Sequence, residues 1–191
     1  MGSDENQPNY AGEGITLFRQ RMFKEAAEKL EKAIDLAPEN ISLWNLHAQA
    51  LASTGDYEEA LKSMEVAVAL DDSNFLNWQL KGTILMRQGD LEGSKKAIDK
   101  SLELNKSSVI YVLRGQVDYN LHNYEESLGF FEEALNRDPD NPLANHMKGL
   151  VLFIQGKHGE AIPFIEKALA VGRSESLEKI LEECRKRTES G

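Results

Sequence analysis

A period of 34 residues runs through the chain and constrains its fold more than any other feature, because recurrence at that length is typical of stacked helical or sheet repeats. The clearest copy is 41–74, where apolar residues recur at three- and four-residue spacing on both sides of Gly55-Asp56. This spacing predicts two helices joined by a tight turn. Segments that begin the second helices follow one another at intervals of 34, 34, 33 and 34 residues: Phe23-Lys24-Glu25-Ala26, Tyr57-Glu58-Glu59-Ala60, Leu91-Glu92-Gly93-Ser94, Tyr124-Glu125-Glu126-Ser127 and His158-Gly159-Glu160-Ala161.

Small residues recur in step with this period. Glycine costs about 1 kcal/mol relative to alanine inside a helix, so its recurrence there predicts a close approach of two helix backbones that offsets the cost. The small residues of the expected first helices are Gly14, Ala48, Gly82, Gly115 and Gly149, and those of the second helices include Ala26, Ala60, Ser94, Ser127 and Ala161.

In these residues, and in Trp44 and Trp78 at the same place of successive repeats, the chain resembles a tetratricopeptide-repeat protein. The resemblance implies an all-α fold, a right-handed α-solenoid of stacked antiparallel helix pairs. We expect five repeats, a capping helix at 175–188 with an apolar stripe, a disordered N-terminus at 1–6 and a frayed tail at 189–191. The repeats span 7–40, 41–74, 75–107, 108–141 and 142–174.

Composition narrows the classes of partner. The formal net charge is −10, from 22 basic and 32 acidic residues, which argues against nucleic acid and favours a neutral to basic protein partner with apolar anchors. The single cysteine, Cys184, excludes an intrachain disulfide. No apolar run reaches the length of a membrane span, and the polar start lacks the apolar core of a signal peptide, so we expect a cytoplasmic protein without a membrane partner.

The sequence carries no constellation typical of an enzyme. His47, His122, His146 and His158 lack the spacing that places two metal ligands on one helix face, and no glycine-rich phosphate loop is present. We therefore expect a non-catalytic protein without cofactors.

One series departs from the family pattern. Glu13, His47, Lys81, Arg114 and Lys148 occupy a place where the family commonly has leucine. We expect the basic members to lay their stems along apolar surface and keep their charges in water. Asp118 replaces a large apolar residue and His122 replaces a turn glycine, so we expect local weakness in the fourth repeat.

The resemblance also implies that first helices line a concave groove that binds a peptide segment or a partner helix. Amide side chains there suit hydrogen bonding to an extended backbone, and a leucine stripe suits apolar anchors. The implied groove residues are Asn45, Leu46, Gln49, Leu76, Gln79, Leu80, Thr83, Arg87, Val112, Leu113, Gln116, Tyr119, Asn120, His146, Met147 and Leu150.

Two alternatives bear on this groove. The leucines could instead pack between adjacent first helices, and the capping helix could cover the apolar patch around Phe153 and Ile154. The places that match the family's clamp for chaperone-tail carboxylates hold neither lysine nor arginine, which disfavours that ligand. A self-assembling, homo-oligomeric repeat protein and a regulatory or co-chaperone adaptor without that clamp are the alternative functions.

Overall fold

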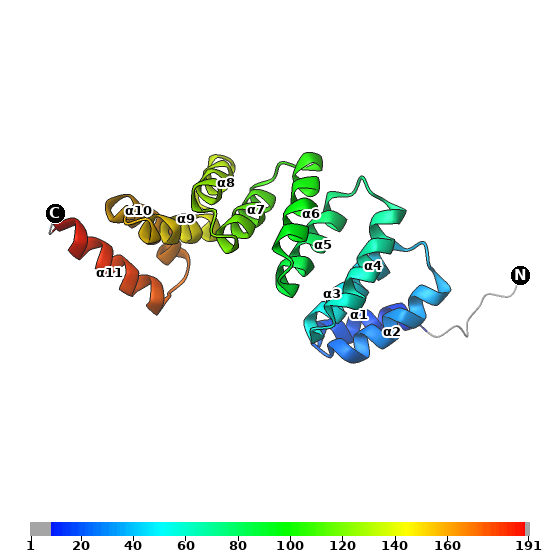
Figure 1. Ribbon diagram of the computed structural model, residues 1–191. Coiled ribbons are helices and arrows are strands. Elements are labelled where there is room, and N and C mark those ends of the chain that lie inside the picture. Colours follow the sequence, from blue (N-terminus) through cyan, green and yellow to red (C-terminus); the bar gives the residue numbers. More distant parts are fainter. Residues whose placement is uncertain (1–8, 190–191) are drawn as a thin grey trace, which may run out of the picture. The chain divides into compact units, whose positions relative to one another are not determined.

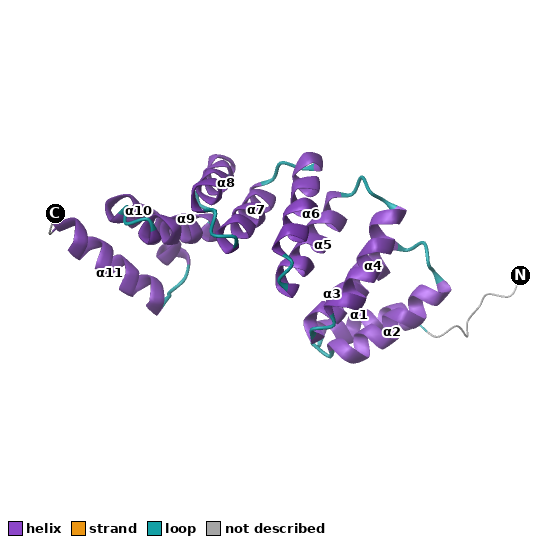
Figure 2. Cartoon of the chain, viewed as in Figure 1, coloured by secondary structure: helices purple, strands orange, loops and turns teal. Residues whose placement is uncertain are grey.

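A computed structural model describes residues 9–189 of the chain, which form eleven helices joined by short loops, with no strand among them (Figures 1 and 2). The expected disordered segment 1–6 and the end of the expected tail, 190–191, lie outside the described residues. The helices are α1 (Tyr10–Arg19), α2 (Phe23–Leu36), α3 (Ile41–Thr54), α4 (Tyr57–Leu70), α5 (Phe75–Gln88), α6 (Leu91–Leu104), α7 (Ser108–Asn120), α8 (Tyr124–Arg137), α9 (Pro142–Ile154), α10 (His158–Val171) and α11 (Glu175–Glu189).

The chain divides into two compact modules, an N-terminal module to Leu104 and a C-terminal module from Asn105. In the N-terminal module the pairs α1–α2, α3–α4 and α5–α6 follow one another, with α2 packed on α3 and α4 on α5. In the C-terminal module α8 of the pair α7–α8 packs on α9 of the pair α9–α10, and α11 packs on α10. The prediction of an all-α chain built from helix pairs with one further C-terminal helix is confirmed.

Each helix pair closes around a small residue that faces a large one. A Cβ atom added to Gly82 would lie 2.5 Å from Cδ1 of Ile98, and one added to Gly115 would lie 2.6 Å from Cε1 of Phe131. Gly149 stands in the same relation to Ile165. The close approach predicted from the small residues is therefore present, and it places a fully buried side chain in the middle of each of these pairs.

Buried serines add polar contacts across the same helix pairs. Ser94 Oγ donates to the carbonyl of Gly82 at 2.7 Å, and Ser127 Oγ donates to the carbonyl of Gly115 at 3.0 Å. A helical carbonyl has a second lone pair that the helix itself does not use. These serines thereby satisfy their own hydroxyls without breaking the first helix.

The turn inside each helix pair requires one residue with positive φ. Gly55, Gly89 and Gly156 fill this place in three pairs, with φ of 93°, 96° and 75°. Arg21 and His122 fill it in the other two, with φ of 64° and 63°. A residue with a Cβ pays about 1–2 kcal/mol in this conformation, so the turn chemistry favours glycine and the two exceptions carry local strain.

The loops between repeats are tied to the helix that follows them. Trp44 Nε1 donates to the carbonyl of Pro38, and Trp78 Nε1 donates to that of Asp72, both at 2.7 Å. Asn145, at the equivalent place of the fifth repeat, donates from Nδ2 to the carbonyl of Pro139 at 3.1 Å. In each case the acceptor lies six residues before the donor.

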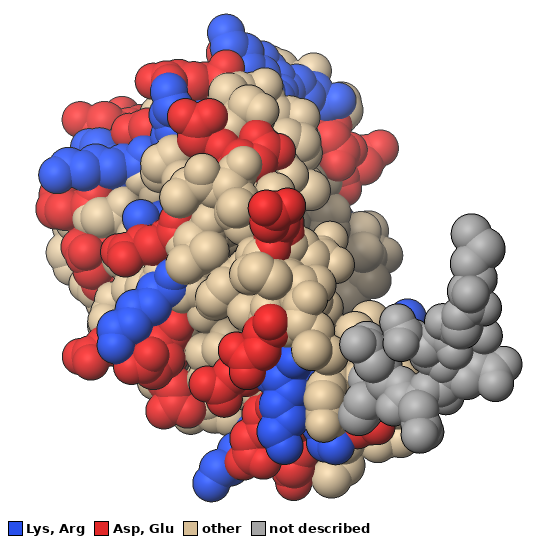
Figure 3. All heavy atoms as spheres, turned by 90° about the vertical axis from the view of Figure 1, so that its right-hand side faces the viewer, with Lys and Arg blue, Asp and Glu red and all other residues tan. Residues whose placement is uncertain are grey.

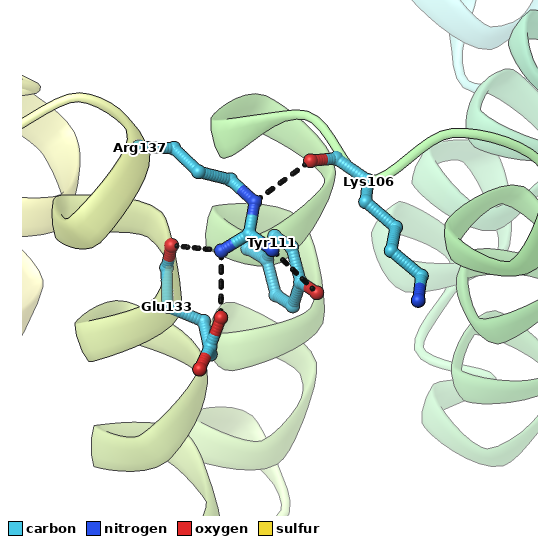
Figure 4. A network of polar contacts seen from close by, with 4 residues as sticks. All are labelled: Lys106, Tyr111, Glu133 and Arg137. Atoms are coloured by element: carbon cyan, nitrogen blue, oxygen red, sulfur yellow. Dashed lines mark hydrogen bonds and ion pairs between the residues drawn. The ribbon is translucent and has the colours of Figure 1, made fainter.

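The fourth repeat replaces this contact with an arginine from its second helix (Figure 4). Arg137 of α8 donates from Nε to the carbonyl of Lys106 at 2.9 Å, and its guanidinium lies 4.2 Å from the ring centroid of Tyr111. The same side chain bonds to Glu133 and to the Tyr111 hydroxyl. One cationic group thus holds the loop, the start of α7 and the end of α8 together.

The expectation that the basic series keeps its charges in water is wrong for Arg114. Its side chain is buried and forms an ion pair with buried Asp118, one helical turn later on α7. The guanidinium also lies 4.6 Å from the ring centroid of Phe130. Asp118, which the sequence marked only as a missing apolar residue, supplies the opposite charge that lets Arg114 lie inside the module.

Candidate protein-interaction surfaces

The predicted residues of the N-terminal module lie on α3 and α5, two first helices that contact each other. Their three- and four-residue spacing places them on one side of each helix. We call this set the N-terminal face, and it comprises Asn45, Leu46, Gln49, Leu76, Gln79, Leu80, Thr83 and Arg87.

Two amides of the N-terminal face are used inside the protein. Asn45 Nδ2 donates to Oδ1 of buried Asn77 at 2.9 Å and so joins α3 to α5. Asn77 donates in turn to the carbonyls of Ala67 and Asp71 at 3.1 and 2.9 Å. Gln49 Nε2 donates to the backbone carbonyl of Asn45 at 3.2 Å. Among the described residues, the side chain of Gln79 has no hydrogen-bond partner, so it is the amide of this face that is free to meet a ligand.

The leucines of this face divide into two kinds. Leu46 and Leu80 are half-buried. Leu46 packs against a buried cluster of α2 and α3, and Leu80 packs against one of α3, α4 and α5. Leu76 is 51% exposed at the start of α5. Arg87, near the end of α5, is exposed and forms no ion pair within residues 9–189. The face therefore offers an apolar residue at one end of α5 and a cation at the other.

The predicted residues of the C-terminal module lie on α7 and α9, which also contact each other. We call this set the C-terminal face, and it comprises Val112, Leu113, Gln116, Tyr119, Asn120, His146, Met147 and Leu150. Val112 and Met147 are buried, so they support the face from inside. The other members are half-buried, except Asn120, which is exposed.

Three more apolar side chains extend the C-terminal face and are more exposed than its predicted apolar members. Val109 is 54% exposed, Leu143 41% and Ile154 43%. Val109 precedes Leu113 by one turn on α7, and Leu143 precedes Leu150 by two turns on α9. The family resemblance also places all three among the residues that face a ligand, and they continue the same stripes.

The last helix leaves Ile154 exposed. α11 packs on α10 through buried Leu177, Leu181 and Cys184. Phe153 is half-buried, with its ring 5.5 Å from that of His158. The patch around Ile154 thus remains open beside the end helix.

The C-terminal face carries little charge. Apart from His146, the charged residues of α7 and α9 are Arg114, Asp118 and Lys148, and all three form ion pairs, Lys148 with Glu132 at 3.0 Å. Partial burial lowers the pKa of His146 below its usual value, which favours the neutral imidazole near pH 7. Elsewhere, on the side shown in Figure 3, basic side chains are scattered among acidic ones.

Neither a metal site nor a membrane span is found in the part of the chain that the structure describes. No group of three or more His, Cys, Asp or Glu side chains in residues 9–189 is arranged to hold a metal ion. No helix within this range is long and apolar enough to cross a bilayer. What the described surface offers is two uncharged or weakly charged helix faces.

Comparison with known families gives matches along most of the chain. A family model described as tetratricopeptide repeat matches residues 12–75 and 112–176, and a second model with the same description matches residues 77–108. No curated protein matches the sequence.

Solved structures of similar fold share few identical residues with this chain. MamA (41-end) from Desulfovibrio magneticus RS-1 has a TM-score of 0.76 at 18% identity, over 87% of this chain and 94% of its own. PilF of Pseudomonas aeruginosa has a TM-score of 0.78 at 17% identity, over 95% and 86%. YrrB, described as a TPR protein with an unusual peptide-binding site, has a TM-score of 0.69 at 18% identity, over 91% and 90%. At these identities the likeness concerns the fold.

Proposed function

Since this chain belongs to the tetratricopeptide-repeat family, we propose that it is a non-catalytic interaction scaffold whose N-terminal and C-terminal faces bind a peptide segment or helix of a partner protein. Scaffolds of stacked repeats act through the surface that their helices present. The proposal therefore depends on the chemistry of the two faces.

The observation that carries the proposal is the exposed apolar stripe of the C-terminal face. Val109, Leu143 and Ile154 are each more than two-fifths exposed, although 28% of the chain is charged and charged side chains could have occupied these places. Exposed apolar residues that gather on one face are typical of a protein interface. We expect this stripe to take the apolar side chains of the partner.

The N-terminal face has a different role in the proposal. Gln79 has both its amide donor and its acceptor available to a partner backbone within the described surface, and Arg87 offers an unpaired cation. Asn45 instead joins α3 to α5, and Gln49 bonds within α3. We expect this face to bind its ligand mainly through hydrogen bonds, and the C-terminal face to bind mainly through apolar contacts.

The partner class is a protein segment, neutral to basic overall, with apolar anchors. The net charge of −10 attracts such a partner and repels phosphate backbones. The similarity in fold to YrrB, described as a TPR protein with an unusual peptide-binding site, supports a peptide ligand. A free terminal carboxylate fits the C-terminal face poorly, since that face has no unpaired cation within the described residues.

The test begins with affinity capture on the purified chain, identification of the bound protein, and titration of its binding segment by fluorescence anisotropy. Leu143→Glu and Ile154→Glu place a charge in the stripe without opening a cavity, and we expect each to weaken binding by about tenfold or more. Leu36→Glu is the matched control, because Leu36 is 56% exposed at the end of α2, a second helix that carries no residue of either face. Equal affinities for all three variants and the wild type would exclude the C-terminal face.

A further inference from the structure

A groove runs between the second helices α8 and α10 of the C-terminal module, with α9 as its floor. Its cavity has a volume of about 530 Å³. The wall from α8 includes Leu128 and Gly129, and the wall from α10 includes Pro163 and Phe164. Lys148 and Leu152 of α9 form the floor. These two residues lie one turn apart, on the side of α9 opposite Leu150, so the groove is separate from the C-terminal face.

The two walls are built from unusual residues for their places. Gly129 and Pro163 occupy equivalent positions of successive second helices, five residues after Tyr124 and His158. The equivalent residues of the first three repeats are Glu28, Lys62 and Lys96, all exposed and long. The two repeats that flank the groove have thus lost the charged side chains that would reach across it.

Neither Gly129 nor Pro163 stabilises the helix in which it lies. Glycine and proline are the two least favourable residues in a helix interior, and Pro163 lies in the second turn of α10, beyond the first turn where proline is tolerated. A Cβ added to Gly129 would meet no atom within 4 Å, so packing does not require glycine there. What both residues share is the open groove between them.

The chemistry of the groove is apolar in its depth and acidic at its rim. Leu128, Leu152 and Phe164 line the interior, and the Lys148 ammonium lies 4.4 Å from the Phe164 ring centroid while bonding to Glu132. At the rim, Lys157 and Gln155 engage Glu125 at 3.8 and 2.8 Å. Glu160 forms no ion pair with any described residue, so one carboxylate of the rim is available to a cation.

We propose that the groove between α8 and α10 is a second binding surface, which takes a peptide segment of a partner protein that carries a large apolar side chain beside a lysine or arginine. The apolar side chain enters between Gly129 and Pro163 and contacts Phe164. The basic residue pairs with Glu160 at the rim. This groove disfavours acidic segments, because its two lysines already have carboxylate partners, Lys148 in Glu132 and Lys157 in Glu125.

The probe is a random peptide library displayed on phage and selected on the wild-type chain, with affinities of the selected peptides measured by fluorescence anisotropy. Gly129→Lys restores the residue type of Lys62 and Lys96 and fills the groove, and we expect it to weaken the groove-binding peptides by about tenfold or more. Gly129→Ala raises helix propensity in the same way but leaves the groove open, so its affinity should match that of the wild type. Glu160→Lys should weaken the same peptides, which we expect to be rich in apolar residues next to lysine or arginine.

Leu143→Glu, on the opposite side of α9, separates this inference from the proposed function. Peptides that lose affinity on Gly129→Lys and not on Leu143→Glu support the second surface. Selected peptides that respond only to Leu143→Glu overturn it and leave the C-terminal face as the binding site. Selection of no peptide, or of acidic peptides alone, also overturns it.

Discussion

Arg114 and Asp118 form an ion pair within α7 in which both side chains are almost completely buried, with exposed fractions of 6% and 1%. Two charges inside a module are costly to desolvate, and each is tolerated only while the other is present. Removing one partner should therefore harm the protein more than removing both.

Asp118→Ala leaves the Arg114 guanidinium buried without its carboxylate. We expect the free energy of unfolding of the C-terminal module to fall by about 3–5 kcal/mol, as for other broken buried pairs. Urea denaturation followed by far-UV circular dichroism measures this change. The double variant Arg114→Leu/Asp118→Leu is the control, since four other repeats have leucine at the place of Asp118. The double variant should recover most of the loss; a double variant as unstable as Asp118→Ala would contradict this account.

Two glycines of the C-terminal module should respond to alanine with opposite sign. In Gly115→Ala the new Cβ would lie 2.6 Å from buried Phe131, so we expect a loss of about 1–3 kcal/mol from overpacking. Gly129→Ala meets no neighbour within 4 Å and should gain up to about 1 kcal/mol from helix propensity. The same urea transition reports both variants. A loss of stability in Gly129→Ala would show that α8 needs glycine for a reason other than an open surface.

His47 should make the N-terminal module less stable in mild acid. Burial lowers the pKa of His47 below its usual value of 6.5, against the opposing effect of Glu31 and Glu59, and its Nδ1 lies 2.9 Å from Ser63 Oγ. The unfolded chain therefore binds the proton more readily than the folded one. This contribution to stability is complete above the unfolded pKa and is lost as the pH falls below it.

The measurement is the free energy of unfolding of the wild type and of His47→Gln at several values between roughly pH 7 and pH 5. Glutamine keeps a polar group near Ser63 but does not titrate. The wild type should lose more stability than His47→Gln across this window. If the free energies of unfolding of the two proteins change with pH in parallel, the His47 imidazole titrates alike in the folded and unfolded states.

Cys184 should report the docking of α11. The side chain is fully buried, burial and Glu183 raise the pKa of its thiol, and its Sγ lies 4.0 Å from His158 Nδ1. A buried thiol with little thiolate reacts slowly with a disulfide reagent such as DTNB. We expect slow labelling in the native protein and rapid labelling in urea.

Leu181→Ala tests whether the protection of Cys184 comes from this helix. Leu181 is buried on the same side of α11, and its truncation should lower stability by about 2–5 kcal/mol. Labelling of Cys184 should then become faster under native conditions. Rapid labelling of the wild type itself would show that α11 is undocked for much of the time.

The repeat and its helix pairs were predictable because they follow from local rules. The small residues at the places of Gly82 and Gly115 recur at one interval, and close backbone approach is the reason for a mid-helix glycine in both cases. The turn position of His122 was also predictable, since glycine fills the same turn in three other repeats. His122 adopts the positive φ of those glycines.

The candidate site was only partly predictable, because exposure depends on which neighbour a side chain meets. Asn45 and Gln79 looked equivalent in the sequence, yet Asn45 bonds to Asn77 across two helices and Gln79 does not. The Arg114 and Asp118 positions each looked like a departure when taken alone, and only their joint burial shows that they compensate each other. The burial of such residues depends on a second residue, so it cannot be predicted from one position of the repeat alone.

The hydrogen bonds from Trp44, Trp78 and Asn145 to the carbonyl six residues earlier set where the protein can be cut into working pieces. A fragment that begins at Ile41 would start at the helix but lose the carbonyl of Pro38, leaving the indole of Trp44 without its acceptor. A fragment that begins at Pro38 keeps it. Truncated proteins for expression should therefore start with the loop that precedes a helix pair. The segment needed for folding is longer than the helices themselves, because it includes that loop.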